Sequence, residues 1–181
     1  MFGYGSLASR PGPAPTRERR ADGFVADLSG WKRGWGVAMD NAVTLPGYKC
    51  YVDADGRRPA VFVAFLDVTE SAGARVNGVC RPVTPGELTA LDVRERNYER
   101  IDVSERVDAG GCRVWAYAGS PAGRERFRLG VARGTAVIHD GYLAAVRAAF
   151  TALGPAEWAA CAPSLAPGGL PVRRLARREL A

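Results

Sequence analysis

A nearly continuous apolar run from Ala60 to Val68 constrains the fold of this chain more than any other segment. The run has the length of one strand and is rich in valine and phenylalanine, which favours a buried β-strand. Residues 76–83 predict a second strand, and residues 24–39, in which Trp31 and Trp35 lie between glycines, predict bent strands. We therefore expect a sheet built from these segments.

Two segments predict helices. In Thr84-Pro85-Gly86-Glu87 the threonine takes the N-cap, the proline the first helical position and the glutamate the third, which is a capping box. We expect this helix to end near Arg94. Residues 142–153 have apolar side chains at helical spacing, and the following Gly154-Pro155 predicts the end of that helix.

A β-hairpin is expected between the two helices. Ile101, Val103 and Val107 alternate with polar residues, which predicts a strand. The glycine-rich residues 108–111 predict a turn, and residues 112–118 predict the return strand.

The remaining segments are rich in turns. Residues 10–22 hold three prolines among charged residues, which predicts a loop, and residues 162–180 predict turns followed by a short helix. The sequence has no internal repeat. Five or six strands against two or three helices indicate a mixed α+β fold.

Composition excludes several classes of protein. The 181 residues are enough for one domain with a core, and 47% apolar and 24% charged residues are typical of a soluble globular protein. No apolar run is long enough for a membrane helix and the N-terminus lacks a signal-peptide pattern, so we expect a cytoplasmic protein with no membrane partner. Four cysteines without CxxC spacing and a single histidine predict reduced thiols and no metal site.

The net charge of +6 raises the question of a nucleic-acid partner. Lysine occurs only at Lys32 and Lys49, so arginine supplies nearly all of the positive charge. The one local cluster holds arginines 173, 174, 177 and 178. This pattern is typical of a composition that favours arginine throughout and of a solvated basic segment, so we expect no nucleic-acid partner.

The opening Met1-Phe2-Gly3-Tyr4-Gly5-Ser6-Leu7 allows three interpretations. The stretch fits the dinucleotide fingerprint G-x-G-x-x-A, but only two residues precede it and prolines 11, 13 and 15 prevent a long helix after it. Ser6 as a nucleophile would require a base, and the only histidine, His139, is more simply an ordinary loop residue. In the third interpretation the glycines allow a turn whose N–H groups hold an anion.

Glu95 is the candidate for acid–base chemistry. It follows Leu88 and Leu91 at helical spacing, so a helix that continued that far would place its carboxylate on the face toward the core. Partial burial of a carboxylate suits a general acid or base. If the helix ends first, Glu95 instead points to water or forms a salt bridge with arginine 94, 96 or 100.

Two motifs in this order give the sequence a resemblance to a known family. "FGYGSL" at the start and "NGVCRPVTPGELTALDVRERNYERIDV" in the middle, followed by the predicted hairpin, resemble the γ-glutamylcyclotransferase-like proteins, which include the ChaC and AIG2-like types. The resemblance implies that the loop Tyr4-Gly5-Ser6-Leu7 holds the γ-glutamyl group and that Glu95 is the catalytic acid/base. Tyr98 matches a tyrosine that follows this glutamate and is a further candidate for substrate binding.

The resemblance also implies a fold and a reaction. The fold is a mixed α+β, partly closed β-barrel with flanking helices over residues 1–160, and residues 161–181 are a basic extension packed on the same domain. The enzyme would release 5-oxoproline from a small-molecule γ-glutamyl amino acid, peptide or amine by intramolecular aminolysis, with no cofactor and no metal. A non-catalytic binding module on this fold is the alternative, and a serine hydrolase using Ser6 and His139 is a third hypothesis.

Overall fold

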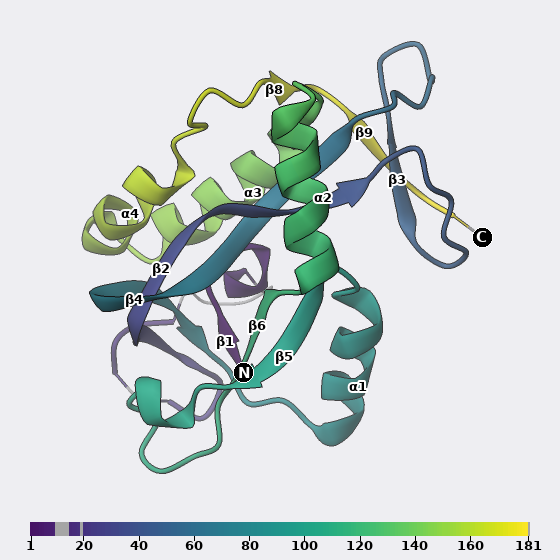
Figure 1. Ribbon diagram of the computed structural model, residues 1–181. Coiled ribbons are helices and arrows are strands. Elements are labelled where there is room, and N and C mark those ends of the chain that lie inside the picture. Colours follow the sequence, from purple (N-terminus) through teal and green to yellow (C-terminus); the bar gives the residue numbers. More distant parts are fainter. Residues whose placement is uncertain (10–14, 19, 181) are drawn as a thin grey trace.

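The computed structural model describes residues 1–9, 15–18 and 20–180. It has a mixed α+β fold in which a strongly twisted sheet curls into a half-barrel with helices around it (Figure 1), which confirms the predicted fold class. The sheet is built on two long antiparallel strands, β2 (Phe24–Asp40) and β4 (Phe62–Cys80). On its other edge, β4 pairs with β1 (Phe2–Gly3) at one end and with the parallel strand β7 (Ala136–His139) at the other.

The strands predicted at 60–68 and 76–83 are the two halves of one strand, β4, rather than two strands. The β2–β4 register passes from Ser29↔Arg75 to Trp31↔Glu70, so β4 carries a bulge of several residues at this point. Small and polar residues fill this bulge, which explains why the sequence pattern predicts a break there. A bulge bends a strand without ending it, and the bend in β2 at the same place confirms the predicted bent strands.

The predicted hairpin is present as β5 (Tyr98–Asp102) and β6 (Trp115–Gly119), which pair antiparallel. Its turn contains Gly110 and Gly111, both at positive φ, as a glycine-rich turn requires. The first strand is shorter than predicted, because the Asp102 carboxylate accepts hydrogen bonds from Ser104 and starts a 3-10 turn. Apolar residues beyond that point are still buried in the core.

Both predicted helices are present. Helix α1 (Pro85–Arg94) begins with the predicted capping box, and α3 (Asp140–Ala152) ends just before Gly154. Two further helices, α2 (Pro121–Ala132) and α4 (Pro155–Cys161), were not predicted. The Ser120 side chain caps α2 and a proline follows it, which is the signal that identified α1.

The C-terminal segment forms strands, so the predicted short helix is wrong. Strand β8 (Val172–Arg173) pairs with β7, and β9 (Ala176–Glu179) pairs with β3 (Lys49–Val52). Extended pairing satisfies backbone groups at the free edges of β7 and β3, which a short isolated helix would leave open. The division into residues 1–160 and 161–181 remains a prediction, while these pairings place the basic extension against β3 and β7.

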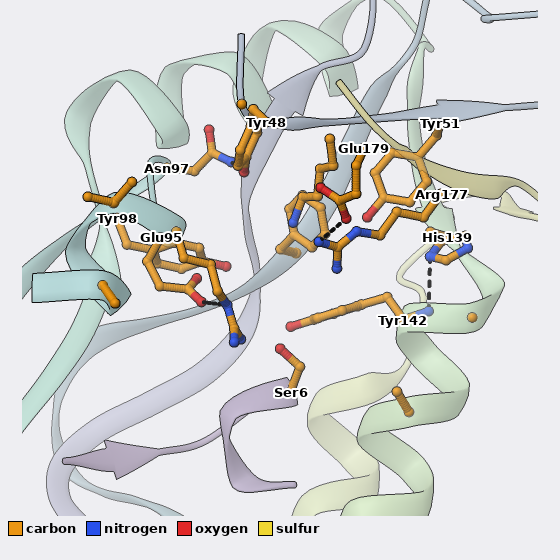
Figure 2. Close-up of a pocket in the computed structure, with 18 residues that line it drawn as sticks. Ser6, Tyr48, Tyr51, Glu95, Asn97, Tyr98, His139, Tyr142, Arg177 and Glu179 are labelled. Atoms are coloured by element: carbon orange, nitrogen blue, oxygen red, sulfur yellow. Dashed lines mark hydrogen bonds and ion pairs between the residues drawn. The ribbon is translucent and has the colours of Figure 1, made fainter. Parts of the chain in front are cut away.

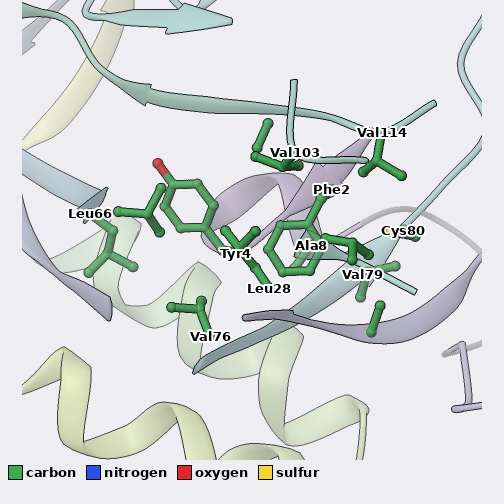
Figure 3. Close-up of a cluster of buried hydrophobic side chains, with 14 of the residues drawn as sticks. Phe2, Tyr4, Ala8, Leu28, Leu66, Val76, Val79, Cys80, Val103 and Val114 are labelled. Carbon is green, nitrogen blue, oxygen red and sulfur yellow. The ribbon is translucent and has the colours of Figure 1, made fainter. Parts of the chain in front are cut away.

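The main core fills the concave side of the sheet and includes the first residues of the chain. Phe2 is completely buried, and Tyr4 and Ala8 pack with it against side chains of β2 and β4 such as Leu28 and Val79 (Figure 3). This burial anchors the chain on both sides of the Gly5-Ser6-Leu7 segment.

Three of the four cysteines are buried, Cys112 is exposed, and all four are free thiols. Of the loop predicted at 10–22, residues 10–14 and 19 lie outside the described residues, while Arg17 forms ion pairs with Asp27 and Glu157. In the described ranges no helix has the length and apolar character needed to span a membrane.

Candidate active site

The opening segment forms a short strand that breaks into a tight turn. Strand β1 ends at Gly3, and Ser6–Ala8 form one 3-10 turn closed by a hydrogen bond from the Ala8 N–H to the Gly5 carbonyl (3.0 Å). In the described residues between this turn and β2 there is no α-helix, which speaks against the dinucleotide interpretation. Among the described residues, no hydrogen-bond partner is found for the N–H groups of Ser6 and Leu7. These two donors are therefore available to a ligand.

Gly5 allows a close approach between the loop and Tyr142. A Cβ atom at this position would lie 3.0 Å from the hydroxyl of Tyr142, which extends from α3 toward the turn. Helix α3 packs beside the Ser6–Ala8 turn and fixes this hydroxyl in place. The glycine thus allows the loop and Tyr142 to line one space.

Glu95 lies just beyond the end of helix α1. Helix α1 ends at Arg94, and Glu95 is its C-cap, with its N–H donating to the Leu91 carbonyl (2.8 Å). The helix ends where expected, and of the orientations left open for Glu95 the salt bridge is observed: Oε1 of Glu95 lies 3.0 Å from Nε of Arg94. The carboxylate is nevertheless only 16% exposed, because the chain turns at the cap and directs it into the pocket.

The predicted site residues lie together around one recess of about 30 Å³. Its lining consists of the loop, the carboxylate and tyrosine of the second motif, and three residues that were not predicted: Tyr4, Gly5, Ser6, Leu7, Glu95, Tyr98, Leu66, Tyr117 and Tyr142. The structure therefore brings the two motifs, which are about ninety residues apart in the sequence, to the same point.

Two of the tyrosines serve as anchors in this recess. The hydroxyl of Tyr4 donates to the Tyr117 carbonyl, and the hydroxyl of Tyr98 donates to the Leu66 carbonyl (2.7 Å). Burial, reinforced by nearby groups that include the Glu95 carboxylate, raises the pKa of both phenols well above the usual value. Both stay protonated, and their only protons are used within the protein.

Tyr142 differs from these two anchors. Its hydroxyl oxygen accepts a hydrogen bond from the Leu66 N–H (3.4 Å), and no acceptor for its own proton is found among the described residues. Burial raises its pKa above the ordinary value, so it remains a donor. Figure 2 shows the hydroxyl groups of Tyr142 and Ser6 directed at the same part of the pocket. No sequence motif marks Tyr142, because its position depends on the docking of α3.

The recess opens into a larger pocket of about 560 Å³, which shares Ser6, Glu95, Tyr98 and Tyr142 with it (Figure 2). The outer part of this pocket is polar. Side chains from β3, β7, β9 and the end of α1 line it, among them Tyr48, Lys49, Asn97, His139, Arg177 and Glu179. Burial raises the pKa of Tyr48 to about 12, so this phenol also stays protonated.

His139 lines the same pocket but is not a free base. Its Nδ1 accepts a hydrogen bond from the Tyr142 N–H (3.1 Å) and caps α3, and its Nε2 lies 2.8 Å from the Leu175 carbonyl. A carbonyl can only accept, so Nε2 carries the proton and neither ring nitrogen is left to activate Ser6. The side chain is only 13% exposed, so His139 is a structural cap of α3 rather than an ordinary loop residue. The serine hydrolase hypothesis therefore lacks the base that it assigned to His139.

Comparison with known proteins identifies the family of this chain. A model of the family described as gamma-glutamyl cyclotransferase, AIG2-like, matches residues 1–133. The chain belongs to this family. The match ends before β7, so α3, β8 and β9, which supply Tyr142, Arg177 and Glu179, lie outside it.

Several solved structures are similar over 73% of this chain. One is named gamma-glutamyl cyclotransferase, with 20% identity, a TM-score of 0.38 and 77% of that chain covered. A protein from Arabidopsis thaliana shares 25% identity, with a TM-score of 0.35 and 73% coverage. An uncharacterized protein from Homo sapiens shares 21%, with a TM-score of 0.36 and 77% coverage. No curated protein matches the chain.

Proposed function

We propose that this protein is an enzyme that releases 5-oxoproline from γ-glutamyl compounds. The observation that carries the proposal is the juxtaposition of the Glu95 carboxylate with the Gly5-Ser6-Leu7 turn in one recess. Membership of the cyclotransferase family supports the same reaction class.

The reaction is an internal aminolysis. The α-amine attacks the γ-carbonyl carbon, a C–N bond closes the five-membered ring, and the bond from that carbon to the leaving nitrogen breaks. The α-amine is protonated at neutral pH, so Glu95 would accept a proton from it and return one to the leaving nitrogen. Nucleophile and electrophile belong to one molecule, so the main contribution of the site is to hold the substrate folded.

The turn and Tyr142 would supply the hydrogen-bond donors. The free N–H groups of Ser6 and Leu7 suit the negative charge of a carboxylate or of the oxygen that develops charge during attack. The Tyr142 hydroxyl is a further donor at the same place. Arg94 holds Oε1 of Glu95, while no ion pair involves Oε2 among the described residues, so this oxygen would handle the proton.

The test is an assay of 5-oxoproline formation from γ-glutamyl dipeptides, a γ-glutamyl amine and glutathione. Glu95→Gln keeps the shape of the side chain and removes its basicity, so we expect a loss in kcat of roughly 10²- to 10⁴-fold. Glu105→Gln, at an exposed carboxylate of the 3-10 turn at Ser104–Arg106, is the matched control and should keep the wild-type rate.

Two results would contradict the proposal. Wild-type protein that forms no 5-oxoproline from any of these substrates, yet binds them in a calorimeter, would indicate the binding module instead. Full activity in Glu95→Gln would remove the acid/base role from Glu95.

A further inference from the structure

The larger pocket has one more positive charge than negative charge. Two of its cations are paired, Arg94 with Glu95 (3.0 Å) and Arg177 with Glu179 (2.6 Å). Lys49 also lines the pocket, and no ion pair to it is found among the described residues. The pocket therefore carries an uncompensated lysine.

The arrangement of side chains on the β3–β9 ladder explains why Lys49 has no ion pair among the described residues. In the β3–β9 ladder Lys49 lies directly opposite Glu179, and Tyr51 lies opposite Arg177. Glu179 nevertheless pairs with Arg177, its neighbour on the same face of β9. The ammonium of Lys49 instead lies over two aromatic rings, 4.6 Å from the centre of Phe65 and 5.3 Å from that of Tyr48.

The position of Lys49 is costly for a cation. Desolvation by burial lowers its pKa to about 8, and the like charges of Arg177 and Arg94 act in the same direction against the attraction of Glu95 and Glu179. The group is still mostly protonated at pH 7. A partly buried cation that lies against aromatic faces and forms no ion pair among the described residues is the arrangement expected where an anion from outside completes the pairing.

The pocket also has two distinct ends. Glu95 lies at one side in Figure 2, with Arg177 and Glu179 on the other and the Tyr142 hydroxyl between them. The γ-carbonyl must lie beside Glu95, and the amides of the Ser6–Ala8 turn suit the carboxylate of the glutamyl group. The leaving group therefore extends toward β3 and β9.

We propose that Lys49 and Arg177 bind a carboxylate on the leaving group, so that the enzyme acts on γ-glutamyl amino acids and peptides in preference to γ-glutamyl amines. This inference rests on the proposed function and specifies its substrate class. The wall that selects the leaving group includes β9, which lies outside the part of the chain that the family model matches.

The test compares γ-glutamyl-alanine with γ-glutamyl-alaninamide, which differ only in whether the leaving group bears a charge. We expect wild-type kcat/KM to be roughly 10- to 100-fold higher for the acid, the range given by a charged hydrogen bond. Lys49→Met should lower the ratio of kcat/KM for the acid to kcat/KM for the amide toward one, and Lys49→Arg should retain much of the preference. Lys32→Met, at the only other lysine and on an exposed part of β2, is the matched control.

The outcomes separate this inference from the proposed function. Equal turnover of acid and amide by the wild type, or an equal loss for both substrates in Lys49→Met, would overturn the inference, although 5-oxoproline formation would still support the function. No 5-oxoproline from either substrate would overturn the function, and the inference with it. A cooperative urea-unfolding transition of Lys49→Met, followed by circular dichroism, shows that this variant is folded.

Discussion

Replacing Lys49 with methionine should stabilise the protein at neutral pH. Burial lowers the pKa of this lysine from 10.5 to about 8, which corresponds to a cost of about 3 kcal/mol for holding the charge in the folded state. Methionine has a similar length and keeps contact with the rings of Phe65 and Tyr48 through its thioether. Loss of the cation–π contacts costs about 1 kcal/mol, so we expect the free energy of unfolding to rise by about 2 kcal/mol in total.

The stability cost of the Lys49 charge depends on pH. The unfolded lysine holds its proton up to about pH 10.5 and the folded one only to about pH 8, so between these values the unfolded chain binds more protons and wild-type stability rises with pH. The cost is fully present below pH 8 and is relieved as pH approaches 10.5. The advantage of Lys49→Met should therefore be largest at pH 7 and should shrink to less than about 1 kcal/mol near pH 10.

Urea unfolding followed by circular dichroism measures this effect. A gain of about 2 kcal/mol should raise the midpoint by about 1 M at pH 7, given an m-value of about 2 kcal/mol/M. The exposed Lys32→Met should leave the midpoint unchanged at both pH values. A midpoint for Lys49→Met that is unchanged or lower at pH 7, or a gain that persists undiminished at pH 10, would refute the reasoning.

Three further predictions follow from contacts at and near the site. The preference for γ-glutamyl-alanine over its amide should decline as pH rises past about 8, where Lys49 loses its charge, in a pH series of kcat/KM ratios. Gly5→Ala should lower the free energy of unfolding by about 1 kcal/mol, because the new methyl group meets the Tyr142 hydroxyl, and thermal unfolding should show a smaller loss in a Tyr142→Phe background. Asp67→Ala should cost about 3 kcal/mol in denaturant unfolding, because it leaves the buried Gly119 N–H without its acceptor; a cost below about 1 kcal/mol would contradict that role.

Much of the local structure was predictable because it depends on neighbours in the sequence. The capping box at Thr84, the glycine turn at 110–111 and the end of α3 at Gly154 each involve residues within a few positions of one another. The same local chemistry at Ser120 went unrecognised, although its serine–proline signal was present. The errors at β4 and at the C-terminal strands have a different cause, since both depend on which distant edge the segment pairs with.

The candidate site was predicted only in part, because its local motifs are visible in the sequence and its distant contacts are not. The two motifs identify the loop and Glu95, and the structure places them around one recess. Spacing left the orientation of Glu95 open, because that orientation depends on where the helix ends. The helix ends at Arg94, and the cap turns the Glu95 carboxylate inward. Tyr142 has no motif of its own and depends on how α3 packs beside the turn.

By itself the sequence determined many of the strands and helices and marked two motifs as the candidate site, because short-range hydrogen bonds and apolar spacing leave a local pattern. Only the tertiary structure decided what surrounds them. The strand register that places Lys49 opposite Glu179 joins residues that are far apart in the chain. Which charges form ion pairs then depends on this register and on the faces that the side chains occupy. Strand register and side-chain faces are set only when the chain folds, so the residues and net charge of the pocket could not be predicted from the sequence.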